Sequence, residues 1–396
     1  MEISSAFLDG VDAGQASGLP PIAESGATAS PSELAEPPRE RLVSLDAFRG
    51  LTVAAMLVVN NTVAEAAPPT LAHAAWGRGI HFADLIFPWF LFIVGAALPF
   101  SLAAQRRKGS SRLRIQLRVL GRTVALVLLG CLVDSSQART PVLGLGVLQL
   151  IGLAYGTASV LYALLPSGRV VVPLLLLVGH WALIRFLPVP GAGAGVWTET
   201  QNAIVYLNQV YLEPFRLKGL VSVIPTAAMV LLGATAGEWL QATRRAVIPG
   251  VLRLVVAGIA LVSVGSVWSL DLQYSKPFWT APYILACAGW GMVTLGLIYG
   301  IVDGCRKRWL AFPLVVFGSN AIVAYVAPIL FKIHVLREWT WTMADGSHYP
   351  LAVAIQSAAY THLGRVWGAW AYTVGFIVLC WLGLFWLYRR RIFLRV

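Results

Sequence analysis

The chain has 396 residues, of which 58% are hydrophobic and only 12% charged, and its mean hydropathy is +0.72. Soluble domains carry about 25% charged residues, so this composition excludes an ordinary soluble protein and indicates one that crosses a membrane several times. The net charge of +12 would suit a nucleic-acid-binding protein, but the Lys and Arg residues lie in short clusters between apolar runs. Such clusters are typical of cytoplasmic loops that face anionic lipid. We therefore expect a lipid bilayer as a partner, and no nucleic acid.

The first segment, residues 1–38, is rich in Ala, Ser, Gly, Pro and Glu and contains no apolar run flanked by basic residues. This composition does not fit a signal peptide and is too polar to pack. We predict a disordered cytoplasmic tail, followed by one membrane domain over residues 39–396. The four cysteines lack metal-ligand spacing, so we expect neither a disulfide framework nor a metal site.

The apolar part of the chain begins after Arg41 with the sequence RLVSLDAFRGLTVAAMLVVNN. Its most hydrophobic portion, residues 48–59, is followed by Asn60 and Asn61 and predicts a first spanning helix whose ends continue through polar residues. Asp46 and Arg49 are three residues apart, which is close enough for an ion pair on one helix face. The alternative is that both residues only cap the start of this helix.

Nine further apolar runs are long enough to cross a membrane. We place them at residues 84–104, 113–133, 144–165, 170–187, 219–240, 247–268, 280–302, 309–331 and 367–388. The sequence therefore predicts an all-α, polytopic membrane bundle of about ten transmembrane helices.

Basic residues orient this bundle. Clusters of Arg and Lys occur at residues 106–114, 244–245, 306–308 and 389–391. With ten spans, all of these clusters fall on one side, which the positive-inside rule makes cytoplasmic, together with both termini. Two long segments on the other side are rich in aromatic residues, which either stack on a sugar or lie in the headgroup belt.

The stretch LAHAAWGRGIHFADLIFPWFLFIVG, residues 71–95, places His73, His81 and Asp84 at the start of a long apolar run. The predicted topology puts these residues on the non-cytoplasmic side, together with Asn60. Ionisable groups beside hydrocarbon are costly to desolvate. We interpret the group as a candidate functional site, with a helix cap or an interface anchor as the structural alternative.

Several motifs resemble, in matching order, those of the heparan-α-glucosaminide N-acetyltransferase family. They are SLDAFRG, LAHAAW followed by FADLIFPWFLFIVG, GVLQLIGLAY, GLVSVIPTAAMVLLGATAGEWL, FWTAPYILACAG and FGSNAIVAYV. The resemblance implies an enzyme that takes acetyl groups from cytosolic acetyl-CoA and delivers them to an amino sugar or glycan across the membrane. For a bacterial relative it implies the inner membrane. SLDAFRG also resembles the wider transmembrane acyltransferase superfamily, so a sugar O-acyltransferase is an alternative.

The resemblance assigns roles to individual residues. His73, in the motif His-Ala-Ala-Trp, matches the family's catalytic histidine, Asn60 matches its partner asparagine, and Asp84 matches the aspartate of Asp-Leu-x-Phe-Pro. Two departures concern the acceptor more than the acetyl chemistry. Leu150 stands where relatives usually carry Arg, and residues 216–219 read RLKG where many bacterial relatives read Asp-Pro-Glu-Gly.

Acetyl transfer from a thioester to an amine needs a base, and the ordinary histidine pKa of about 6.5 suits that role at neutral pH. His73 acts either as this base or as a nucleophile that carries the acetyl group. Asp84 orients the imidazole, and Asn60 donates a hydrogen bond to the oxyanion. His81 has no family counterpart, and we assign it to substrate binding or structural support, together with Asp46 and Arg49.

A path for acetyl-CoA across the bundle needs polar residues. Arg114, Arg118 and Arg122 recur every four residues on the third span and suit the phosphates of coenzyme A, or else extend to the lipid interface. A second set of buried polar residues either contacts pantetheine or joins helices. This set comprises Gln149, Ser319 and Asn320.

A sugar transporter or flippase without acyl chemistry is the competing class. Transporters often contain internal repeats, and the sequence shows none by inspection. The sequence does not identify the acceptor, and the family resemblance suggests a homodimer.

Overall fold

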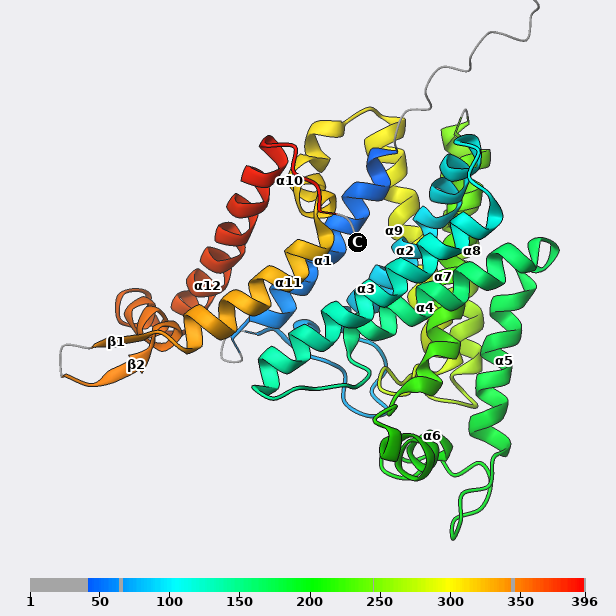
Figure 1. Cartoon of the computed structure of the whole chain (residues 1–396), viewed down its shortest axis with the longest axis horizontal. Helices are drawn as coiled ribbons and strands as arrows, with labels where there is room; N and C mark the ends of the chain where they lie inside the picture. Colours follow the sequence, from blue (N-terminus) through cyan, green and yellow to red (C-terminus); the bar gives the residue numbers. More distant parts are fainter. Residues whose placement is uncertain (1–41, 64–66, 245, 343–345, 395–396) are drawn as a thin grey trace, which may run out of the picture. The chain divides into compact units, whose positions relative to one another are not determined.

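The computed structural model describes residues 42–63, 67–244, 246–342 and 346–394. The predicted tail at residues 1–38 lies outside these residues. The described residues form an all-α bundle with one two-stranded sheet, which confirms the predicted fold class (Figure 1). The long helices are α1 Val43–Asn61, α2 Phe82–Arg107, α3 Arg112–Ala138, α4 Val147–Leu164, α5 Val171–Phe186, α7 Val223–Ala242, α8 Val247–Trp268, α9 Ala281–Tyr299, α10 Arg308–Ser319, α11 Ala321–Phe331 and α12 Leu351–Arg389. A short helix, α6 Ala203–Leu207, and an antiparallel pair, β1 Thr340–Thr342 with β2 His348–Pro350, lie in the connecting segments.

Each of the ten predicted spans overlaps at least one of these helices. Among the described residues, eight helices are long and apolar enough to cross a membrane, and α10 with α11 makes a ninth when counted as one bent span. The remaining helix, α5, has 16 residues, fewer than the roughly 20 that a perpendicular span needs.

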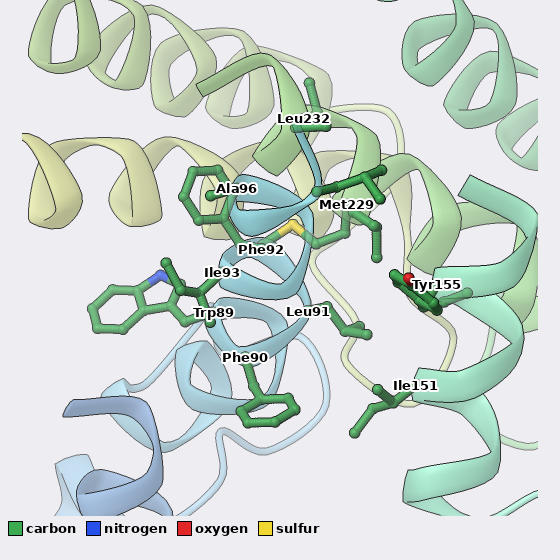
Figure 2. Packing of buried hydrophobic residues seen from close by; sticks show 14 of the residues in the cluster. Trp89, Phe90, Leu91, Phe92, Ile93, Ala96, Ile151, Tyr155, Met229 and Leu232 are labelled. Atoms are coloured by element: carbon green, nitrogen blue, oxygen red, sulfur yellow. The ribbon is translucent and has the colours of Figure 1, made fainter. Parts of the chain in front are cut away.

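Helix α2 lies at the centre of the packing. Its side chains join those of α4 and α7 in one buried cluster (Figure 2). Gly95 of α2 and Gly233 of α7 face the backbone of the opposite helix so closely that a Cβ atom at either position would collide with a carbonyl group. Small residues of this kind let membrane helices approach closely and gain van der Waals contact. Trp89 of α2 also donates a hydrogen bond to the carbonyl oxygen of Cys287 in α9, at 3.0 Å.

The predicted ninth span is broken. Its halves, α10 and α11, meet at an angle of 65° because Asn320, between them, leaves the helical backbone conformation. The Asn320 side chain is fully buried and holds the C-terminal segment. It donates to the carbonyl oxygen of Ile392 at 3.0 Å and accepts from the backbone N–H of Leu394 at 2.9 Å.

The last helix is longer than predicted. It begins at Leu351 rather than near residue 367, and it is interrupted at Gly364, whose φ of 75° is unfavourable for residues with a side chain. The segment before the break extends from β2.

Two ends of the bundle differ in their polar contacts. We call the end at which α1 finishes and α2 starts the His73 end. At the opposite end, Glu238 of α7 accepts hydrogen bonds from Tyr162 of α4 and from Arg169. The Arg169 guanidinium also lies 4.3 Å from the centre of the Tyr162 ring. This cluster ties α4 and α7 together.

Candidate active site at the His73 end

The loop between α1 and α2 positions the candidate site. Asp84 lies in the first turn of α2, with its side chain only 4% exposed. Its Oδ2 atom accepts hydrogen bonds from the backbone N–H groups of Ala74, at 3.0 Å, and His81, at 3.1 Å. A carboxylate is favourable at this position because it meets unpaired N–H groups and the positive end of the helix dipole. Asp84 therefore both caps α2 and holds the loop that carries His73.

His73 contacts the other oxygen of the same carboxylate. Its Nδ1 atom lies 2.8 Å from Asp84 Oδ1. Because a carboxylate only accepts hydrogen bonds, Nδ1 carries the hydrogen, which leaves Nε2 of a neutral imidazole as a proton acceptor. The His73 side chain is 57% exposed and lines a cavity, and its Nε2 atom lies 3.4 Å from Lys276 Nζ.

Lys276 is the third member of this cluster, and it was not among the site residues predicted from the sequence. It lies in the loop between α8 and α9, and its Nζ atom is 3.6 Å from Asp84 Oδ1 and 3.1 Å from His73 Nδ1. Burial lowers the pKa of Lys276 from its usual range, while the negative charge of Asp84 opposes this shift. A signal for Lys276 exists in the sequence, since it is a single lysine just before an apolar run on the predicted side of His73.

Asn60 lies on the same cavity as His73. This cavity has a volume of about 180 Å³ and is lined by both residues together with Lys276, Tyr325 and the apolar side chain of Met56. A second, smaller cavity of about 70 Å³ reaches Asp84 and Lys276 from the side of Trp76. The structure thus brings together the three residues that we predicted as catalytic, and their roles remain predictions.

His81 has a structural place in the loop. Its Nδ1 atom lies 3.0 Å from the carbonyl oxygen of Ala72, and its backbone N–H donates to Asp84. Both contacts close the loop around His73. They agree with the predicted structural role of His81, whereas its role in substrate binding remains a prediction.

The three arginines predicted to bind coenzyme A lie on the first half of α3, away from the His73 end, and all are exposed. Arg118 donates to Gln105 Oε1 at 3.1 Å, and the Arg122 guanidinium lies 5.1 Å from the centre of the Tyr155 ring. Arg114 is the member nearest the start of the helix. A row of exposed cations suits phosphate groups, and the predicted cofactor role remains untested.

The remaining polar residues of the predicted cofactor path bond to protein groups. Gln149 is fully buried, and its Nε2 atom donates to Asp134 Oδ2 at 2.8 Å. Ser319 donates to the carbonyl oxygen of Val316 at 2.8 Å, and Asn320 holds the C-terminal segment as described above. Contact of these three residues with pantetheine remains a prediction.

Asp46 and Arg49 form the predicted ion pair, with Arg49 Nη1 2.9 Å from Asp46 Oδ1. The start of α1 is capped by a different residue, because Asp303 accepts hydrogen bonds from the backbone N–H groups of Val43 and Ser44. Both features lie at the end of the bundle opposite His73 and support α1 from there.

The fold and the site together define a multi-pass membrane protein with a histidine–aspartate pair at one end of its helix bundle. A sequence model of the heparan-alpha-glucosaminide N-acetyltransferase catalytic family matches residues 41–270, more than half of the chain. The chain therefore belongs to this family, as the sequence motifs predicted.

Two curated relatives show the same similarity. The chain is 24% identical to human heparan-alpha-glucosaminide N-acetyltransferase over 374 residues, which cover 76% of this chain and 54% of the human protein. It is also 24% identical to the mouse protein of the same name over 379 residues, 77% of this chain and 55% of the mouse protein. The chain thus spans about half the length of the curated relatives it matches. Lys276 lies outside the region that the family model matches.

Proposed function

We propose that the protein is a transmembrane acetyltransferase that moves an acetyl group from cytosolic acetyl-CoA to an amino sugar or glycan on the other side of the membrane. The observation that carries this proposal is the 2.8 Å contact between His73 Nδ1 and Asp84 Oδ1 beside a cavity that Asn60 also lines. The names of the curated relatives support N-acetyl transfer to a glucosaminide as the reaction class. For a bacterial protein, the membrane is the inner membrane.

In this reaction His73 Nε2 removes a proton from the acceptor amine. The amine nitrogen bonds to the thioester carbonyl carbon, the carbon–sulfur bond breaks, and the coenzyme A thiolate leaves and takes the proton back from the imidazolium. Asp84 stabilises the imidazolium and keeps the Nδ1 tautomer. The Asn60 amide and the Lys276 ammonium, which line the same cavity as His73, donate hydrogen bonds to the developing oxyanion.

In the alternative sequence of steps, His73 Nε2 itself attacks the thioester and carries the acetyl group before the amine takes it. Both orders of reaction steps need the same residues. They differ in whether an acetylated protein forms without an acceptor.

The distribution of charge supports the proposed orientation. The exposed arginines of α3 lie away from the His73 end, where coenzyme A phosphates would remain in the cytosol. The basic clusters near the opposite ends of the helices support a cytoplasmic location for that side by the positive-inside rule.

The test is labelled acetyl transfer in sealed membrane vesicles of both orientations, with amino sugars inside or outside, for the wild type and His73→Ala. The proposal predicts that label from acetyl-CoA on the cytoplasmic side reaches a sugar on the other side only when His73 is present. Transport of unmodified sugar at equal rates in both proteins, without acetyl transfer, would instead show that the protein is a transporter. The break between α10 and α11 favours transport as this second candidate, because broken helices line the substrate sites of many transporters.

A further inference from the structure

A second, larger cavity adjoins the His73 cavity. It has a volume of about 480 Å³, within the range of about 300–1,000 Å³ that small-molecule sites occupy. Three residues, Met56, Asn60 and Tyr325, line both cavities. A molecule in the larger cavity can therefore extend past Asn60 toward His73.

The walls of this cavity come from α1, α11 and the ends of neighbouring segments. Figure 1 shows α11 beside α1, and the end of α3 contributes Gln137. Apolar residues of α1 and α11, such as Val53 and Ile329, form much of the wall, and Tyr325 also lines it. An apolar and aromatic wall with a few polar groups is the usual construction of a site for a sugar-sized ligand.

The charged residues of the cavity are all positive. Lys332 and Arg337 line it from the helical segment after α11, and its described lining contains no Asp or Glu. In the part of the chain that the structure describes, neither cation forms an ion pair with a carboxylate. Lys332 donates instead to Asn61 Oδ1 at 3.2 Å. Two cations on one cavity without an anion favour a negatively charged ligand.

We propose that this cavity binds the acceptor through an anionic group, a carboxylate or phosphate carried on the sugar, held by Arg337 and Lys332. The proposal rests on the proposed function, since it identifies the substrate class of that same site. The anionic group lies at the cation-lined wall, and the sugar extends along Tyr325 and Asn60, so that its amine reaches His73 Nε2. Acetyl-CoA reaches His73 from the opposite end and does not use Arg337.

Arg337 is the better residue to change, because Lys332 also contacts the carbonyl oxygen of Asn60 at 3.5 Å, and its loss would disturb a candidate catalytic residue. Arg185 is a matched control. It lies at the end of α5, away from α11, does not line the cavity, and pairs with Asp271.

The experiment measures binding of methyl glucosaminide and of its 6-phosphate to the purified full-length chain in phosphatidylcholine nanodiscs, by calorimetry. The wild type and Arg185→Ala are expected to bind the phosphorylated sugar at least about tenfold more tightly, the usual scale of a charge-assisted hydrogen bond. In Arg337→Ala this preference is strongly reduced, because only Lys332 is left to hold the anionic group, while the affinity for the unphosphorylated sugar and for acetyl-CoA stays unchanged. Should Arg337→Ala not fold, Arg337→Lys is expected to keep a reduced preference, because it retains the charge without the planar guanidinium.

Three results would overturn the proposal. The first is equal affinity of the wild type for the two sugars, or a preference that is undiminished in Arg337→Ala. The second is loss of acetyl-CoA binding in Arg337→Ala, which would assign the cavity to the donor. The third is loss of the sugar preference when phosphatidylglycerol is added to the nanodiscs, which would show that a lipid headgroup fills the cavity. Because binding is measured without turnover, a wild type that binds the phosphorylated sugar but never acetylates it would refute the proposed function and leave the anion site intact.

Discussion

Two carboxylates at opposite ends of the bundle, Asp84 and Glu238, illustrate two uses of a charge beside a membrane. Glu238 contacts Arg169 and the Tyr162 hydroxyl, and these partners join two helices and a connecting turn. Asp84 also caps its own helix, but its remaining oxygen contacts a histidine that is more than half exposed. In the first cluster the side chains bond to one another, whereas the second includes a histidine side chain that lines a cavity.

The two clusters differ in whether they contain a side chain that exchanges a proton near neutral pH, and not in the charges that surround the carboxylate. Both acids have a cationic neighbour, Arg169 for Glu238 and Lys276 for Asp84. An arginine stays charged at any ordinary pH and suits a permanent link, whereas histidine changes its protonation near neutral pH. The following predictions test whether the Asp84 cluster is catalytic and the Glu238 cluster structural.

The largest effect is expected for His73→Ala. Loss of a positioned base lowers the rate of acetyl transfer by about 10²–10⁴-fold. The thermal midpoint of unfolding should stay close to that of the wild type, because the side chain is largely exposed. His362→Ala, which changes another exposed histidine, is the matched control and should retain full activity in the same radiolabel assay.

The two carboxylates are compared directly by Asp84→Asn and Glu238→Gln. We expect Asp84→Asn to lower the transfer rate by about 10²-fold, because an amide neither stabilises the imidazolium nor fixes the Nδ1 tautomer. Glu238→Gln should instead lower the free energy of unfolding by about 1–2 kcal/mol and leave the transfer rate unchanged. Rates and melting curves of both variants are the measurement. Equal losses of rate would remove the distinction between the clusters.

The lowered pKa of Lys276 predicts that the rate of acetyl transfer depends on pH. Since burial lowers its pKa below the ordinary value, its ammonium is lost on the alkaline side at a lower pH than in a free lysine. A rate that depends on the ammonium therefore falls there. Lys276→Arg keeps its charge and should move this fall to higher pH, whereas Lys276→Met should lower the rate about tenfold. A pH–rate profile that is the same for the wild type and Lys276→Arg would exclude this role.

The same shift affects stability. The unfolded state binds the Lys276 proton more tightly than the folded state does. This contribution to the free energy of unfolding therefore rises as pH increases from the lowered pKa toward about 10.5, and it is lost as pH falls. Melting curves of the wild type and Lys276→Met over this range show the difference, and parallel pH dependences would contradict it.

The smallest effect is expected for Asn320→Ala, which removes two hydrogen bonds to the C-terminal segment. The free energy of unfolding should fall by about 1–2 kcal/mol, with faster proteolysis of that segment. The KM for acetyl-CoA separates the two roles considered for Asn320. An unchanged KM assigns it to the fold, and a rise of several fold supports the predicted pantetheine contact.

The sequence predicted the helices more completely than the site. Long apolar runs alone give the ten helical regions, because a bilayer requires helices of a certain length. The exact positions of the bend at Asn320 and of the break at Gly364 were not predicted, since each depends on backbone conformation at a single residue. Hydropathy does not report such a change.

For the site, the sequence identified groups that are close along the chain. His73, His81 and Asp84 lie within one short stretch, and Asn60 was placed by the family motif. Lys276 was missed because about 200 residues separate it from His73, as the contact between them shows. Only the packing of α9 against α2 and α8 brings that loop to the site. Residues that are so far apart in the sequence are identified as neighbours only from a structure.

The most direct test of the proposed catalytic pair is a double-mutant cycle on His73 and Asp84. Transfer rates are measured under single-turnover conditions for the wild type, His73→Ala, Asp84→Asn and the double variant in the same nanodiscs. If Asp84 acts through the imidazole, the double variant is no slower than His73→Ala alone, because residues that act as a unit are strongly non-additive. If the two losses multiply instead, Asp84 acts independently of His73, and the pair is not the catalytic unit of this protein.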